Sequence, residues 1–185
     1  MKKVTLLGDS IRMNYQARVR ELLAPDYEVF YYEDNGRWAQ YTLRSLFEYS
    51  AQIAGSDVIH WNNGHWDLCD RFGDGNFTPE KQYAETLKRV ADRLLTITPN
   101  VIFATTTPVR PENVYNSDAA IRRYNELAVT TLTPMGIEIN DLYGSVARDI
   151  PRYICDDLIH LTPEGIELCA GKVAKAIRGA GCGCV

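Results

Sequence analysis

The chain has 185 residues, of which 45% are hydrophobic and 24% charged, and its formal net charge is −4. This length and composition predict one domain over residues 1–185 and exclude a wholly disordered chain or a disulfide-held miniprotein. The acidic balance argues against a nucleic-acid surface, and no apolar run approaches the roughly 20 residues that cross a bilayer. We therefore expect neither nucleic acid nor a membrane as a partner.

The first half of the chain alternates short apolar runs with segments of helical periodicity. The expected strands lie at 4–7, 28–32 and 57–61, and the expected helices at 11–23 and 41–53. Gly8 ends the first strand where the chain turns without a Cβ penalty, and Asp9 and Ser10 follow directly. The Asn35-Gly36 pair indicates a loop at the carboxyl end of the second strand.

The second half continues the same alternation. Strands are expected at 101–104 and 137–142, and helices at 79–98, from Ser117 or Asp118 to Leu132, and from Pro163 to about Arg178. Thr78 and Thr162 are the candidate N-caps of the first and last of these helices, and Pro163 suits a first helical position. Five strands alternating with helices predict an α/β fold with a doubly wound parallel sheet.

Ser10 stands at the carboxyl end of the first predicted strand, the edge of such sheets where ligands bind. A serine hydroxyl is a poor nucleophile without a base, and the base needs an orienting partner. Asp157 and His160 supply both, because a carboxylate three residues away can pair with Nδ1 and leave Nε2 to take the serine proton. Asp156 is a second candidate for the orienting role, although the spacing favours Asp157. Asp9 is interpreted as shaping the nucleophile turn.

These motifs resemble the SGNH, or GDSL-type, serine hydrolases over essentially the whole chain. Gly8-Asp9-Ser10 matches the family's first block, and Asp157-x-x-His160 matches its fifth. Gly36 matches the second-block glycine, whose backbone N–H serves the oxyanion hole together with that of Ser10. The resemblance implies a three-layer α/β/α sandwich with a flavodoxin-like five-stranded sheet, and hydrolysis of acyl esters without a cofactor.

The third block departs from the family pattern. The family has Gly-x-Asn-Asp there, with the asparagine as an oxyanion donor, whereas this chain has Trp66 at that position of Gly64-His65-Trp66-Asp67. An indole N–H can donate a hydrogen bond, but it is bulky and offers no acceptor. The alternative amide donors are Asn62, Asn63 and Asn35, of which we prefer Asn63.

Several residues are candidates for substrate binding. Arg12 either holds a substrate group or is a surface arginine, and Arg110 is expected at the pocket rim. Trp38, Trp61 and Trp66 form either a sugar-stacking platform or part of the core. The glycine-rich segment 70–79 is expected as a flap near the site. The expected substrate is a small acyl ester, with an acetylated carbohydrate preferred; the oligomeric state is left open.

Two alternative functions are weighed against a serine esterase. The tryptophan in the third block suits a catalytically lapsed carbohydrate-binding protein of the same fold. A metal-dependent hydrolase would use His60 and His65 with Asp67 and Asp70, but this spacing matches no zinc site. We therefore predict no metal ligands and no cofactor.

The cysteines and the two ends of the chain bear on its compartment. Five cysteines without regular spacing indicate mostly reduced thiols. Cys182 and Cys184 suit either a metal-binding or redox pair or, as we prefer, a disordered tail over about 180–185. The apolar run at 4–7 is shorter than the apolar core of a signal peptide. A cytoplasmic location is expected, or a secreted or periplasmic one if an upstream signal was removed.

Overall fold

The computed structural model describes residues 1–180, so the predictions for Cys182, Cys184 and the tail lie outside the described residues. The strands are β1 (Lys2–Leu7), β2 (Tyr27–Tyr31), β3 (Val58–Trp61), β4 (Val101–Ala104) and β5 (Glu138–Asn140). The helices are α1 (Ser10–Leu23), α2 (Ala39–Glu48), α3 (Ser50–Ile53), α4 (Glu80–Leu95), α5 (Asp118–Leu132), the 3₁₀ turn η1 (Thr133–Met135), α6 (Leu142–Val146), α7 (Ile150–Tyr153) and α8 (Pro163–Ala180).

The five strands form one sheet in the order β2-β1-β3-β4-β5, and every pair is parallel. Strand β1 lies between β2 and β3, and its Val4 pairs with Val29 on one side and with Val58 on the other. This is the flavodoxin-like order, in which the topological switch lies between β1 and β3. The predicted doubly wound parallel sheet is therefore confirmed.

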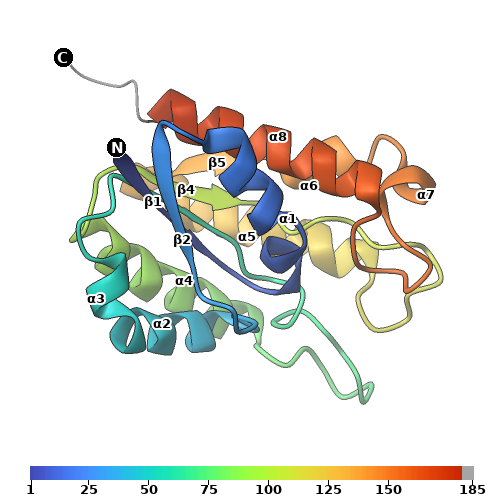
Figure 1. The fold of residues 1–185 in the computed structure, drawn as a ribbon. Helices are drawn as coiled ribbons and strands as arrows, with labels where there is room; N and C mark the ends of the chain where they lie inside the picture. Colours follow the sequence, from blue (N-terminus) through green and yellow to red (C-terminus); the bar gives the residue numbers. More distant parts are fainter. Residues whose placement is uncertain (181–185) are drawn as a thin grey trace.

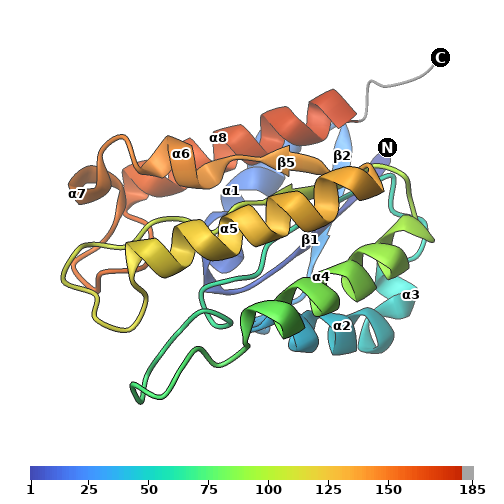
Figure 2. The same cartoon turned by 180° about the vertical axis from the view of Figure 1, so that it is seen from behind.

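Helices cover both faces of the sheet, because alternate side chains of each strand point to opposite faces and both sets are apolar. Ile59, Trp61 and Phe103 pack in a core cluster with residues of α2, α4 and α5. Val58 and Ile102 belong to a second cluster with residues of α1 and α8. Figures 1 and 2 show the resulting three layers, with α1 and α8 on one side and α2, α4 and α5 on the other.

Two predicted helix starts are explained by their caps. The Ser117 hydroxyl accepts from the N–H of Ala120 at 3.2 Å at the start of α5. The Thr162 hydroxyl accepts from the N–H of Gly165 at 3.1 Å, and Pro163 is the first residue of α8. Both threonine and serine caps satisfy an N–H that has no partner within the helix.

Three predicted boundaries are wrong. The expected helix over 41–53 is interrupted at Tyr49, whose ring stacks on that of Tyr32 with centroids 4.9 Å apart. Thr78 does not cap α4, because it is buried and its N–H donates to the carbonyl of Asp67 at 2.9 Å. The expected strand over 137–142 ends at Asn140, since Asp141 caps α6 through the N–H of Gly144.

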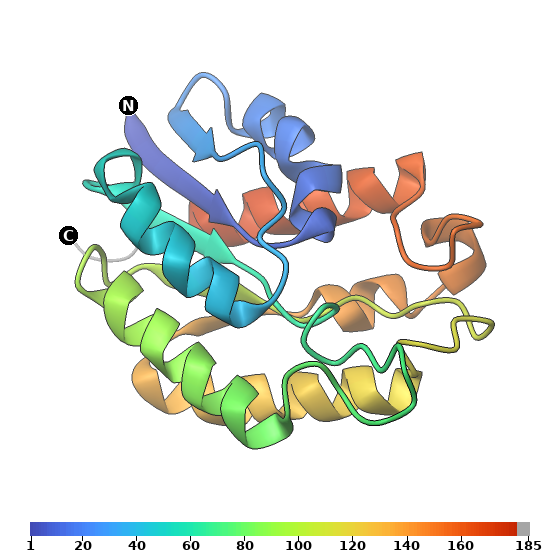
Figure 3. The ribbon, with the colours of Figure 1, turned by 90° about the horizontal axis from the view of Figure 1, so that it is seen from below.

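The loops that leave the carboxyl ends of the strands gather at one end of the molecule. Figure 3 shows the segment between β3 and α4, the segment between β4 and α5, and the segment before α8 at this end. Parallel strands place all such segments on the same edge, which brings Ser10 and the loop of residues 154–161 within reach of each other. Within residues 1–180, no helix is both long enough and apolar enough to cross a bilayer.

Candidate active site

The nucleophile turn is built from Gly8, Asp9 and Ser10. Gly8 has φ +144°, and a Cβ there would lie 2.0 Å from the side-chain oxygen of Asn62, so only glycine fits. Asp9 caps α1, and its Oδ1 accepts from the N–H of Ile11 at 2.9 Å and from Nδ2 of Asn62 at 2.8 Å. Ser10 is the first helical residue, so its backbone N–H has no acceptor within the helix.

The Asp9 carboxyl is fully buried behind this turn. Burial raises its pKa, and the hydrogen bonds from Asn62 and Ile11 and the charge of Arg12 oppose that rise. All of these contacts hold the turn in place, in keeping with the interpretation that Asp9 shapes the turn.

The structure brings Ser10, His160 and Asp157 together in one line of contacts. His160 Nε2 lies 2.9 Å from Ser10 Oγ, and His160 Nδ1 lies 2.7 Å from Oδ2 of Asp157. The other oxygen of Asp157 accepts the backbone N–H groups of His160 at 2.9 Å and Ile159 at 3.1 Å. Leu158 adopts a left-handed φ of +76°, which reverses the chain between the acid and the imidazole.

The protonation states follow from these contacts. Partial burial disfavours a charged Asp157, but the two backbone N–H groups and the His160 imidazole outweigh it and lower the pKa of this carboxyl. An ionised carboxylate only accepts, so Nδ1 of His160 carries a proton. The lone pair of Nε2 then faces Ser10 Oγ, the arrangement that a general base requires.

Asp156, the alternative orienting acid, does not contact His160. Its side chain is 98% exposed and pairs with Arg110 at 3.0 Å. Arg110 also donates to the carbonyl of Ile154 at 2.9 Å, and it does not line the cavity that contains Ser10. The prediction of Arg110 at the pocket rim is therefore wrong: its guanidinium holds the loop that carries Asp157.

A cavity of about 480 Å³ opens beside Ser10. It is lined by Ser10, Asn35, His65, Trp66, Cys69, Arg71, Phe72, Phe77, Asn116, Ile159 and His160. Phe72 and Phe77 come from the segment expected as a flap, and 79% of the Phe72 side chain is exposed. An exposed aromatic pair in a polar, glycine-rich segment was the sequence signal that could have identified these two wall residues.

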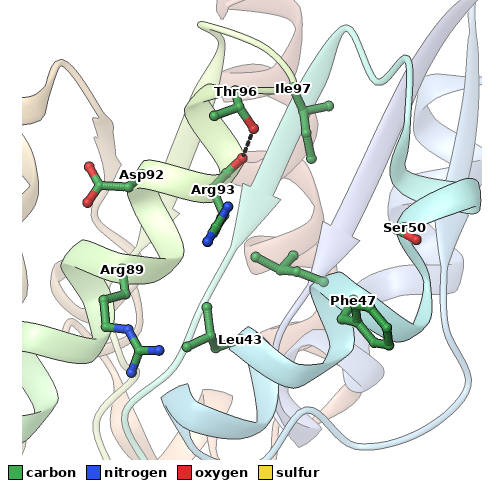
Figure 4. A pocket seen from close by; sticks show the side chains of 9 residues that line it. Leu43, Phe47, Ser50, Arg89, Asp92, Arg93, Thr96 and Ile97 are labelled. Atoms are coloured by element: carbon green, nitrogen blue, oxygen red, sulfur yellow. Dashed lines mark hydrogen bonds between the residues drawn. The ribbon is translucent and has the colours of Figure 1, made fainter.

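A larger cavity of about 770 Å³ lies away from this site, between α2 and α4 (Figure 4). Leu43 and Phe47 of α2 face Arg89 and Arg93 of α4 across it. Its lining contains one serine, Ser50, but no histidine. Because a serine needs a base to act as a nucleophile, the smaller cavity, which contains both Ser10 and His160, is the candidate active site.

The second-block resemblance implies that the Gly36 N–H donates to an oxyanion, but in the structure this N–H has another acceptor. That N–H donates to the carbonyl of Gly8 at 2.9 Å. A Cβ at Gly36 would lie 2.3 Å from the same carbonyl oxygen, so the residue must be glycine for the two loops to approach. Its role is to join the loop after β2 to the nucleophile turn.

Asn63, the preferred amide donor, is also excluded from the cavity. Its side chain is buried, with Oδ1 accepting from the indole N–H of Trp61 at 2.8 Å and Nδ2 donating to the carbonyl of Arg37 at 3.0 Å. The amide of Asn62 is directed at Asp9. Of the four side chains considered as oxyanion donors, only Asn35 and Trp66 line the cavity.

Arg12 is fully buried and does not reach the cavity, so its predicted contact with substrate is wrong. The guanidinium donates to the carbonyls of Tyr32 at 2.8 Å, Asp34 at 2.6 Å and Gly8 at 3.3 Å. Arg12 therefore ties the loop after β2 to the nucleophile turn. Burial lowers the pKa of Arg12, which several nearby groups oppose.

The three tryptophans do not form one platform. Trp61 is buried in the core, edge-on to Phe103 with centroids 4.9 Å apart. Trp38 packs edge-on against Trp66 at 5.8 Å, and of these two only Trp66 lines the cavity. The sugar-stacking prediction is thus wrong for Trp61, and Trp38 reaches the site only through its neighbour.

His60 and His65 are buried as neutral imidazoles, and burial lowers the pKa of each to about 3. Nε2 of His60 lies 3.2 Å from Nδ2 of Asn140, and Nε2 of His65 lies 3.1 Å from Oγ1 of Thr107. Over residues 1–180, no three histidine, cysteine or acidic side chains gather as a metal site would require. The histidines and aspartates that a metal-dependent hydrolase would use as ligands therefore do not come together in residues 1–180.

Solved structures of other proteins share the fold of this chain, whereas sequence comparisons find no match. Neither the models of protein families nor the curated protein sequences give a match. Solved structures do. A lipase/acylhydrolase from Enterococcus faecalis is 18% identical, with a TM-score of 0.83 over 97% of this chain and 96% of that one. An acetylxylan esterase from Geobacillus stearothermophilus is 16% identical, with a TM-score of 0.77 over 95% and 94%.

A third similar structure carries the family description directly. A member of the lipolytic G-D-S-L family from Veillonella parvula is 17% identical, with a TM-score of 0.75 over 95% of this chain and 97% of that one. At these identities the likeness defines the fold. The chain has the SGNH hydrolase fold of the GDSL-type lipases and esterases, as its motifs predict.

Proposed function

We propose that this protein is a serine esterase that cleaves small acyl esters through an acyl-enzyme. Ser10 Oγ attacks the ester carbonyl while His160 Nε2 takes its proton, and Asp157 holds the imidazole. The tetrahedral intermediate collapses, and the alcohol leaves with the proton from His160. Water, deprotonated by the same imidazole, then attacks the acyl-serine, and the acid is released with Ser10 restored.

One observation carries this proposal: Nε2 of His160 is 2.9 Å from Ser10 Oγ while Nδ1 of the same ring is 2.7 Å from the Asp157 carboxylate. These residues come from positions 10 and 157–160, so the contact exists only because the fold joins the two loops. The similar structures named as an acylhydrolase and an acetylxylan esterase support an acyl ester as the bond that is cleaved.

The substrate we favour is an acetyl or other short acyl ester of a carbohydrate. Two observations support it: one similar structure is named as an acetylxylan esterase, and the part-exposed Trp66, backed by Trp38, offers an aromatic face in the cavity. Aromatic faces pack well against the apolar faces of sugar rings. The substrate step rests on this likeness and on the cavity wall, and not on the Ser10–His160 contact.

Replacing Ser10 by alanine tests the proposed reaction. We expect Ser10→Ala to abolish hydrolysis of p-nitrophenyl acetate and labelling by a fluorophosphonate. Ser10 contacts Nε2 of His160, and the lining of the cavity contains no second serine or threonine that could replace it as the nucleophile. Ser50→Ala, an exposed serine of the other cavity, is the matched control and should retain full activity.

Thermal unfolding should give similar midpoints for Ser10→Ala and the wild type, since no buried group is removed. Hydrolysis retained by Ser10→Ala would exclude the proposed nucleophile. A wild type that binds acetylated oligosaccharides but neither hydrolyses esters nor reacts with the fluorophosphonate would be the catalytically lapsed binding protein instead.

A further inference from the structure

An esterase of the proposed kind needs hydrogen-bond donors for the negative oxygen of its tetrahedral intermediate, so this inference rests on the proposed function. The N–H of Ser10 is one such donor, because the first residue of a helix has no acceptor within it. The N–H of Gly36 and the amide of Asn63 are both bonded elsewhere. A side-chain donor must therefore come from another position in the cavity wall.

Asn35 lines the same cavity as Ser10 and His160. Its Oδ1 accepts the backbone N–H of Arg37 at 2.8 Å, which sets the orientation of the amide. Nδ2 of Asn35 carries two hydrogens, and no protein group in residues 1–180 accepts either of them. The loop thus holds an amide whose acceptor end is occupied and whose donor end is available beside the nucleophile.

The backbone on both sides of Asn35 is attached to the nucleophile turn. Before it, the carbonyl of Asp34 accepts from the buried Arg12 at 2.6 Å, and Arg12 also contacts the carbonyl of Gly8. After it, the N–H of Gly36 donates to that same carbonyl at 2.9 Å. Asn35 is therefore held between two attachments to Gly8, two residues from Ser10, and its donor is preorganised.

We propose that Nδ2 of Asn35 donates a hydrogen bond to the oxyanion of the tetrahedral intermediate, in place of the asparagine that the third block lacks. The donor is thus supplied by the loop after β2 instead of the loop after β3. Trp66 then forms the wall of the cavity through its ring. The buried Arg12 acts as a positioning residue, because it fixes the loop that carries the amide.

The test compares Asn35→Asp, Asn35→Ala and Trp66→Phe on p-nitrophenyl acetate. Asn35→Asp keeps the acceptor for the N–H of Arg37, so the loop is retained, but it replaces the donor by a carboxylate oxygen. We expect kcat to fall by about 10² to 10³ in Asn35→Ala and further in Asn35→Asp, with little change in KM. Trp66→Phe, which keeps an aromatic ring in the cavity but loses the indole N–H, should lower kcat far less than either Asn35 variant, because its contribution is to substrate binding and appears in KM.

The rate of Ser10 labelling by a fluorophosphonate should fall in parallel, because the phosphonyl oxygen occupies the same position. If both Asn35 variants keep kcat within about threefold while the wild type is active, the assignment of Asn35 is overturned and the esterase stands. A large loss confined to Trp66→Phe would assign the donor to the indole. A wild type without hydrolysis or labelling would overturn the proposed function and this inference with it.

Discussion

Asp157 differs from the buried aspartate of a chymotrypsin-type triad in its contact with solvent. Half of its side chain is exposed, 50% against 37% for His160, yet it accepts two backbone N–H groups besides the imidazole. Water competes for an exposed carboxylate, so its hydrogen bond to the imidazole itself contributes little to folding. In the proposed mechanism, Asp157 keeps the proton on Nδ1 and the ring aimed at Ser10.

Replacing Asp157 by asparagine should therefore reduce activity more than stability. The amide can donate to Nδ1 and so favours the tautomer with the proton on Nε2, which cannot accept from Ser10. A buried triad aspartate loses about 10⁴ in kcat on this change, and we expect about 10² to 10⁴ here because solvent reaches the pair. Steady-state hydrolysis measures the loss, and Asp156→Asn, on the adjacent exposed carboxylate, serves as control. Equal activities of the two variants would contradict the assigned role.

Gly8 and Gly171 differ in whether their surroundings require a glycine. Gly8 ends β1 at φ +144° and touches Asn62, whereas Gly171 lies on the exposed side of α8 with no atom near the position of a Cβ. The first is required by the turn that delivers Ser10 to the start of α1. The second only adds backbone freedom to the unfolded chain.

Alanine at these two positions should thus have opposite effects on the free energy of unfolding. We expect Gly171→Ala to raise it by about 0.5–1 kcal/mol. Gly8→Ala should lower it by more than about 2 kcal/mol, because a Cβ 2.0 Å from Asn62 forces the turn apart. Urea denaturation measures both changes. A neutral Gly8→Ala would show that the nucleophile turn can relax.

Asp67, in the loop after β3, joins the start of α2 to the segment before α4. Its buried carboxyl accepts the N–H of Ala39, the first residue of α2, at 3.2 and 3.1 Å, and its own carbonyl accepts from Thr78 before α4. Burial raises the pKa of Asp67 to about 7, although the N–H of Ala39 lowers it in part. In the unfolded chain the same carboxyl has its ordinary pKa near 3.8.

The raised pKa of Asp67 predicts a pH dependence of stability. Between about pH 4 and pH 7 the folded protein binds the proton more tightly, so this group's contribution to the free energy of unfolding falls as the pH rises, by up to about 1.4 kcal/mol per pH unit. Asp67→Asn keeps an acceptor for Ala39 but cannot ionise. Urea denaturation at pH 4.5, 6 and 7.5 should show the wild type losing stability relative to the variant.

Asp92→Asn, on the exposed side of α4, is the control for this experiment and should follow the wild type. If the wild type and Asp67→Asn change in parallel with pH, Asp67 titrates near its ordinary pKa and is better solvated than its burial implies.

The fold and the pairing of Asp157 with His160 could be predicted from sequence because local patterns determine them, whereas the contact of His160 with Ser10 depends on the fold that joins their two loops. Apolar runs buried on both faces predict parallel strands, and the alternation with helices predicts the layers. The acid and the imidazole are three residues apart, so their pairing needs only one loop. Likewise the Ser117 and Thr162 caps were recognisable, since a cap is a contact between neighbours in the chain.

The donor set of the site was decided only by tertiary structure. Asn35, Asn62 and Asn63 are equivalent as amides in sequence, and packing determines that two of them are consumed by Asp9, Trp61 and the Arg37 carbonyl while the third borders the cavity. Arg12 was misjudged for the same reason. Besides the Gln16 side chain one turn further along α1, its partners are backbone carbonyls, which every residue carries; only the folded chain shows which carbonyls lie within reach.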